Sequence, residues 1–93
     1  MTGKPKEIPV DFPKELIGGV YSNNMAVSHT REEFIMDFLM LTQPSGAVTA
    51  RVIVSPGHIK RIARALQENI SKYEQEFGSI QAPEETEEKV TIQ

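Results

Sequence analysis

Hydrophobic residues follow a two-residue period in the first half of the chain and a helical period in the second half. In residues 20–28 the apolar positions Tyr21, Met25 and Val27 keep to a two-residue period, and Asn23 interrupts the series. Residues 47–54 place two sets on opposite faces, namely Val48, Ala50, Val52 and Val54 on one and Thr49, Arg51 and Ile53 on the other. The two-residue period predicts that both segments are strands. The β-branched residues, which are dense in the second segment, favour the same structure there.

Between these segments, residues 34–41 are apolar on both faces, and Asp37 is the single charged residue. The two sets are Phe34, Met36, Phe38 and Met40 on one face and Ile35, Leu39 and Leu41 on the other. We favour a central strand, entered by a hairpin turn around residues 29–32. A helix over residues 31–41 is the alternative, because Thr30 followed by Glu33 is also a capping-box pattern and period alone does not settle a short apolar run. Residues 43–46 (Gln-Pro-Ser-Gly) predict the next turn.

A long helix is predicted over residues 56–77. Ser55 is suited to the N-cap, Pro56 to the first helical position and Gly78 to the stop. One apolar stripe runs along it, formed by Ile59, Ile62, Ala63, Leu66, Ile70, Tyr73 and Phe77. At 1.5 Å per residue the helix is about 33 Å long, whereas an eight-residue strand spans only about 26 Å. The last turns, with Tyr73 and Phe77, are therefore expected to overhang the sheet.

The flanking segments differ from this core in composition. Residues 1–17 contain prolines at intervals of four and predict an extended arm, in which Ile8, Val10 and Phe12 would suit an edge strand. Residues 79–93 carry four glutamates against one lysine, which equals the whole net charge of -3. We expect this tail to be largely disordered and solubilising, or alternatively to bind a partner through Val90 and Ile92 as a short strand. Residues 18–78 then form the single folded domain.

Composition excludes several classes of protein. The chain has no cysteine, so it has no disulfide framework, thiolate metal site or cysteine nucleophile. It lacks the run of about 18 apolar residues that a membrane span needs and an apolar signal-peptide core, so we expect a cytoplasmic protein. A chain of 93 residues is also too short for a deep two-lobed catalytic cleft.

Candidate catalytic and metal-ligating residues are sparse. The two histidines, His29 and His58, lack the His-x-x-x-His and Glu-x-x-His spacings, and a metal site would need help from Asp37, Glu32 or Glu33. A serine nucleophile, Ser28 or Ser55, would lack the Gly-x-Ser-x-Gly turn that exposes such a residue. We therefore expect no enzyme activity, no metal and no cofactor.

The charges of the predicted helix oppose its dipole. Lys60, Arg61 and Arg64 lie near the N-terminus, where cations are disfavoured by about 0.3–1 kcal/mol each, and the glutamates follow further on. Three explanations stay open, namely an anionic partner, pairing with a second subunit, and an ordinary solvated face paired within the chain. The candidate surface for an anion or nucleic acid comprises Arg51, His58, Lys60, Arg61 and Arg64. The negative net charge and the lack of a nucleic-acid-binding motif make nucleic acid possible but not favoured.

Several of these residues resemble a known family, and the matching set is Ser28-His29, Glu33-Phe34, Asp37-Phe38, Arg51-Val52, Ser55-Pro56, His58, Lys60-Arg61, residues 65–70, residues 72–74 and Phe77-Gly78. The set is similar to a family of small prokaryotic proteins catalogued only as a domain of unknown function. The resemblance covers about residues 20–78 and leaves the arm and the acidic tail outside. It supports the order of strands and helix, and it implies no activity, ligand or catalytic residue.

The sequence thus predicts an α+β protein in which a three-stranded antiparallel meander packs on one long C-terminal helix. Phe34, Met36, Phe38 and Met40 are expected to meet Ile59, Ile62, Leu66 and Ile70. One helix covers one sheet face only, so we expect a homo-oligomer, with a dimer favoured. Its interface is predicted to use Ile35, Leu39, Leu41, Ile53, Tyr73 and Phe77. The predicted function is that of a non-enzymatic assembly or adaptor protein, with a protein partner possible. A regulator that binds nucleic acid or another polyanion is the alternative.

Overall fold

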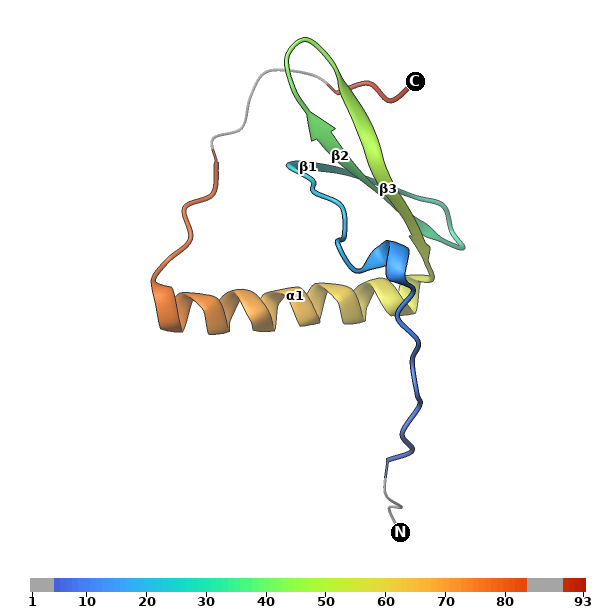
Figure 1. Cartoon of the computed structure of the whole chain (residues 1–93), viewed down its shortest axis with the longest axis vertical. Helices are drawn as coiled ribbons and strands as arrows, with labels where there is room; N and C mark the ends of the chain where they lie inside the picture. The colour runs from blue at the N-terminus through green and yellow to red at the C-terminus, as the bar shows by residue number, and fades with distance from the viewer. Residues whose placement is uncertain (1–4, 84–89) are drawn as a thin grey trace. The chain divides into compact units, whose positions relative to one another are not determined.

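The computed structural model describes residues 5–83 and 90–93, and the chain divides into two compact units, Met1–Val54 and Ser55–Gln93. The first unit contains the 3₁₀ helix η1 (Lys14–Leu16) and the strands β1 (Asn24–His29), β2 (Phe34–Leu41) and β3 (Gly46–Val54). The second contains the helix α1 (Pro56–Phe77), as Figure 1 shows. The predicted α+β class and the order of elements are confirmed. Packing of the helix on the sheet and dimerisation stay predictions.

Residues 34–41 form the central strand of an antiparallel meander in the order β1-β2-β3, which confirms the strand prediction for this segment. Thr30 makes the turn before it. Its hydroxyl accepts hydrogen bonds from the backbone N–H groups of Glu32 and Glu33, both at 3.2 Å, and its own N–H donates to the Glu33 carbonyl at 2.9 Å. The Thr30–Glu33 pattern therefore closes a hairpin and does not begin a helix.

The predicted turn at residues 43–46 is also present. The backbone N–H and the hydroxyl of Thr42 both donate to the Ser45 carbonyl at 3.0 Å. Gly46 follows and pairs with Leu41 in the ladder. A β-carbon at position 46 would lie 2.7 Å from Leu41 Cδ2 and 2.7 Å from the Met40 carbonyl oxygen. The turn therefore needs glycine at this position because the backbones of β2 and β3 approach each other closely here.

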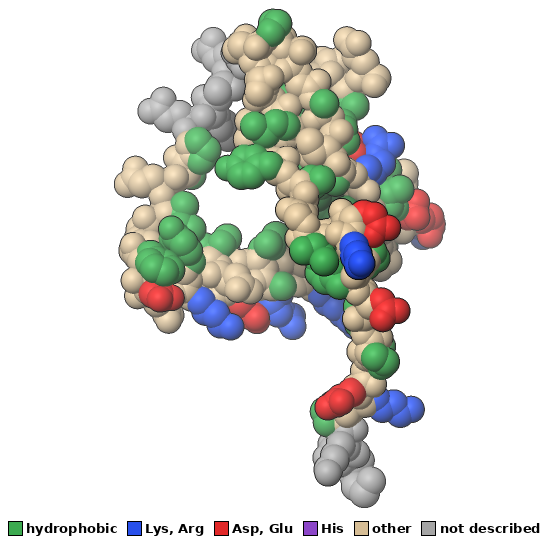
Figure 2. Space-filling model, viewed as in Figure 1, with side chains coloured by type: hydrophobic (Ala, Val, Ile, Leu, Met, Phe, Trp, Pro, Cys, Tyr) green, Lys and Arg blue, Asp and Glu red, His purple; other side chains and the backbone are tan. Residues whose placement is uncertain are grey.

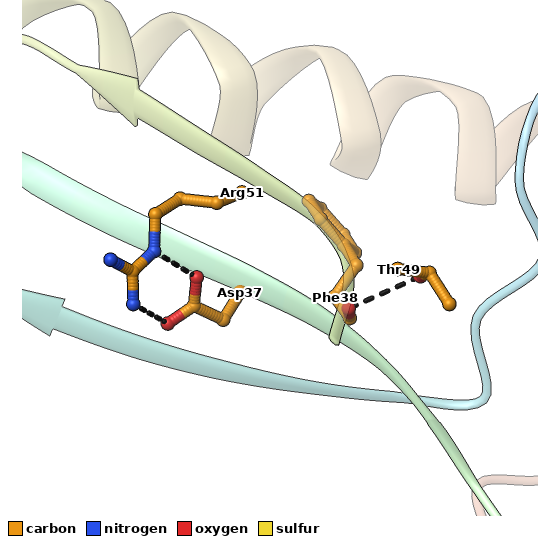
Figure 3. Close-up of polar contacts among 4 residues, drawn as sticks. All are labelled: Asp37, Phe38, Thr49 and Arg51. Carbon is orange, nitrogen blue, oxygen red and sulfur yellow. Dashed lines mark hydrogen bonds and ion pairs between the residues drawn. The ribbon is translucent and has the colours of Figure 1, made fainter. Parts of the chain in front are cut away.

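A β-bulge between β2 and β3 corrects the predicted faces of the third strand. Phe38 pairs with Ala50, but Leu39 pairs with Val48, so Thr49 is the extra residue. The Thr49 hydroxyl donates to the Phe38 carbonyl at 3.1 Å (Figure 3). Directly paired residues project to the same face, so Val48 lies on the face of Leu39, not on the face of Val52 as the uninterrupted alternation predicted.

The first strand is shorter than predicted because Asn23 ends its ladder. The Asn23 side chain accepts from the Leu41 N–H at 2.8 Å and donates to the Leu41 carbonyl at 2.9 Å. The amide thereby occupies both backbone groups of Leu41 that a further strand residue would use. β1 accordingly begins at Asn24, and Tyr21 lies outside the sheet, exposed.

The flanking segments have little regular structure. Residues 5–13 form neither helix nor strand, so Ile8, Val10 and Phe12 do not add an edge strand, and all three are exposed. Val90 and Ile92 do not lie in a strand either. The predicted disorder of the tail falls in part on residues 84–89, which lie outside the described residues.

Helix α1 has the predicted bounds. The Ser55 hydroxyl accepts the His58 N–H at 3.2 Å, and Pro56 occupies the first turn. Gly78 ends the helix with a φ of 94°, a left-handed conformation that favours glycine, and its N–H donates to the Glu74 carbonyl at 2.9 Å. No residue of α1 is buried. The buried positions of the described chain lie in β2, at Met36, Asp37 and Leu39.

Candidate functional site

Arg51, one of the predicted anion-binding residues, is engaged by Asp37 in the sheet. The two residues are direct partners in the β2–β3 register. Arg51 Nε donates to Asp37 Oδ1 at 2.6 Å and Arg51 Nη2 donates to Oδ2 at 2.9 Å, which makes the pair bidentate (Figure 3). The Asp37 side chain is 7% exposed, whereas that of Arg51 is 57% exposed. The largely exposed arginine thus pairs with and compensates the charge of a buried carboxylate.

The electrostatics of the pair follow from this geometry. The hydrogen bonds from the Arg51 guanidinium, aided by its positive charge, lower the pKa of Asp37 against the opposing effect of burial. The same hydrogen bonds and the carboxylate charge raise the pKa of Arg51. Both groups therefore stay charged at neutral pH, and the charge of Arg51 is balanced locally. This makes Arg51 a weaker candidate for an external anion than a free surface arginine.

The other members of the predicted anion surface lie in the second unit, on α1. Lys60, Arg61 and Arg64 are exposed, and within the described part of the chain none of them has an ion-pair or hydrogen-bond partner. His58 is exposed at the first turn. Charged side chains gather along one side of α1 and apolar side chains along the other (Figure 2). The structure thus brings the three cations together on one helix, while Arg51 belongs to the other unit.

One face of the sheet is apolar throughout. The residues that the register places on this apolar sheet face are Met25, Val27, Phe34, Met36, Phe38, Met40, Ala47, Ala50, Val52 and Val54, with His29 at one end. The imidazole of His29 lies against Phe34, with ring centroids 5.3 Å apart. Met36 is buried between its neighbours, whereas Met25, Val27 and Val52 on the two edge strands are exposed. The predicted interface does not include these edge residues. The signal for them is that the outer strands of a three-stranded sheet have a neighbour on one side only.

The opposite face carries the predicted interface residues of the sheet, and the Asp37–Arg51 pair interrupts them. Leu39 is 4% exposed within a single copy, so its side chain offers little surface to a partner. Ile35 and Leu41 are half-buried, whereas Ile53 is exposed. Val48, which the bulge moves to this face, is exposed as well.

The apolar stripe of α1 is the second large apolar surface. Leu66, Ile70, Tyr73 and Phe77 are exposed by 60%, 41%, 50% and 66%. The rings of Tyr73 and Phe77, one helical turn apart, have centroids 5.0 Å apart and form an aromatic cluster at the end of the helix. A helix with such a stripe normally buries it, so this surface is a candidate binding surface.

In residues 5–83 and 90–93, no three side chains of histidine, aspartate or glutamate gather as metal ligands would. In the same residues, no helix has both the length and the apolar character needed to cross a bilayer.

Residues 1–82 match the family described as "Protein of unknown function (DUF3467)". The chain belongs to this family. The match extends through the N-terminal arm, which the resemblance seen in the sequence left outside, so the arm is part of what the DUF3467 family shares. No curated protein and no solved structure matches the chain.

Proposed function

We propose that this DUF3467 protein is a non-enzymatic assembly protein that acts as a homo-oligomer. The observation that carries the proposal is the amount of apolar side chain that one copy leaves uncovered in regular structure. It includes Val27 and Val52 on the sheet and Leu66, Tyr73 and Phe77 on the helix. Contiguous apolar patches larger than a few hundred Å² are rare on soluble monomers and mark interaction sites.

The experiment that tests the proposal is a measurement of mass in solution. Light scattering on the full chain at micromolar concentrations is expected to give about twice the 10.4 kDa chain mass, or a higher multiple. A two-fold dimer is the simplest closed arrangement. A constant mass of one chain over the whole concentration range would refute the proposal.

A regulator of nucleic acid or another polyanion is the second candidate. It is favoured by the exposed cations Lys60, Arg61 and Arg64, which have no ion-pair partner in the described residues. The test is titration of labelled duplex DNA and of heparin at about 50 and 200 mM salt. An assembly protein is expected to show no salt-sensitive binding to either polyanion. For a polyanion-binding regulator, the logarithm of the affinity falls linearly with the logarithm of the salt concentration.

A triple variant tests the polyanion-binding candidate directly. Replacing Lys60, Arg61 and Arg64 by glutamine removes charges that oppose the helix dipole, so folding is expected to be kept. If the cluster binds a polyanion, the variant loses that binding and its salt slope shrinks. Lys72→Gln, further along the same helix, is the control and should leave the polyanion binding and its salt slope unchanged.

A further inference from the structure

The exposed side of α1 contains a regular seam. Its members follow one another at alternating intervals of four and three residues: Ile59, Ala63, Leu66, Ile70, Tyr73 and Phe77. This spacing is the heptad pattern with which two helices pack along each other. None of the six side chains is buried, and Ile59 is the only one of them that is even half-buried. The seam spans the helix from its first turn to its last.

We propose that the seam binds the same seam of a second copy, with the two helices antiparallel about a two-fold axis. The inference rests on the homo-oligomer proposed above and names the surface that forms it. An antiparallel alignment places Leu66 opposite Ile70 of the second copy and Ala63 opposite Tyr73 of the second copy. Ile59 then faces Phe77 of the second copy. Each large ring therefore meets a smaller side chain, which is the arrangement that fills a core without voids.

The parallel arrangement fits less well. It would set each side chain opposite the same residue of the second copy. The two Ala63 side chains would then leave a gap, whereas the two Phe77 rings would crowd each other. It would also align the two helix dipoles. The order of side chain sizes along α1 therefore favours the antiparallel pair.

The charges beside the seam show the same complementarity. Lys60, Gln67 and Glu74 lie seven residues apart along one flank of the seam. In the antiparallel pair, Lys60 of each copy lies beside Glu74 of the other, and the two Gln67 side chains meet near the two-fold axis. A pairing demand of this kind accounts for Lys60 and Glu74, two of the charges that oppose the helix's own dipole.

Glu74 is held in place for this role. It is half-buried, and its Oε2 accepts the Ile80 N–H at 2.8 Å. This hydrogen bond ties the carboxylate to the backbone that follows α1 and so fixes its position. It leaves Oε1 for the ammonium group of Lys60 of the second copy. A seam that binds an unrelated protein does not require Lys60 and Glu74 of one helix to be complementary to each other. The seam and its charged flank together therefore indicate a second copy of this chain.

Cysteine trapping tests the arrangement, because the chain has no cysteine of its own. Gln67→Cys in the full chain is expected to form a disulfide-linked dimer under mild oxidation, at least about tenfold faster than Gln75→Cys, which lies on the side away from the seam. Equal or faster trapping of Gln75→Cys would overturn the helix pairing.

Charge exchange provides a second measurement that does not depend on oxidation. Lys60→Glu and Glu74→Lys are each expected to weaken dimerisation by about tenfold, since two attractive pairs become repulsive. An equimolar mixture of the two variants, and the double variant, should regain the parent affinity. Lys72→Glu, on the polar side of α1, is the control and should change little. Failure of both rescues would overturn the pairing.

The two measurements and the mass together distinguish the two proposals. A dimeric mass without trapping at Gln67→Cys and without rescue would place the oligomer interface elsewhere, which overturns the helix pairing and leaves the assembly function standing. A monomeric mass for the parent would overturn both. A dimeric mass with trapping and rescue is the expected result.

Discussion

Leu39→Ala is expected to destabilise a single copy of the chain strongly. Leu39 lies in the central strand and is 4% exposed, so nearly the whole side chain has left water. Removal of three buried carbons costs about 2.4 kcal/mol at about 0.8 kcal/mol per carbon. The cavity left behind raises the total to about 2.5–5 kcal/mol. Small domains are stable by about 5–15 kcal/mol, so the loss is a large fraction of the free energy of unfolding.

Urea unfolding followed by circular dichroism measures this loss, and the concentration dependence identifies its origin. The difference between Leu39→Ala and the parent is expected to be the same at two protein concentrations about twenty-fold apart, because the side chain is buried within one copy. Ile53→Ala on the same sheet face is the control. With Ile53 half exposed, its truncation should cost only about 1 kcal/mol within one copy.

Two outcomes would contradict this reasoning. A loss below about 1 kcal/mol for Leu39→Ala would show that the side chain is not in the core. A loss that shrinks as the protein is diluted would show that a second copy, and not the chain itself, covers Leu39.

Three further predictions concern the ion pair, the second turn and the helix cap. Because the Arg51 guanidinium lowers the pKa of Asp37 in the folded chain, the pair stabilises the fold above the unfolded value of about 3.9, and this contribution is lost as the pH falls through the lowered value. Asp37→Asn should therefore show a shallower loss of stability below about pH 4 in acid titrations followed by circular dichroism, and an unchanged slope would contradict it. Gly46→Ala should cost about 1–3 kcal/mol in urea unfolding because its β-carbon meets Leu41 and the Met40 carbonyl, whereas Gly57→Ala, with open space around it, should be neutral or stabilising. Ser55→Ala should lower the free energy of unfolding by about 0.5–2 kcal/mol through loss of the helix cap, and Ser55→Asn should restore it.

The sequence by itself determined the elements whose signals are local. The helix begins and ends at the predicted residues because Ser55, Pro56 and Gly78 act through hydrogen bonds and dihedral angles within one turn of the chain. The second turn was predictable for the same reason, since residues 43–46 and Thr42 bond to their own neighbours. The first turn was predicted around residues 29–32, but Thr30 also suited a helix N-cap, and its hydrogen bonds in the structure decided for the hairpin. The central strand followed from an apolar run between two such turns.

Only the tertiary structure decided which strand residues face each other. An unbroken ladder counted back from the second turn would set Asp37 opposite Ala50, but the bulge at Thr49 moves Arg51 into that place. The bulge depends on a hydrogen bond from Thr49 to Phe38, eleven residues away, and no local pattern announces it. The start of β1 depends in the same way on Asn23 reaching Leu41 across the sheet. Partner choice across a sheet is a property of two segments at once, so residues that were predicted as free surface, such as Arg51, acquired their roles only when the strands met.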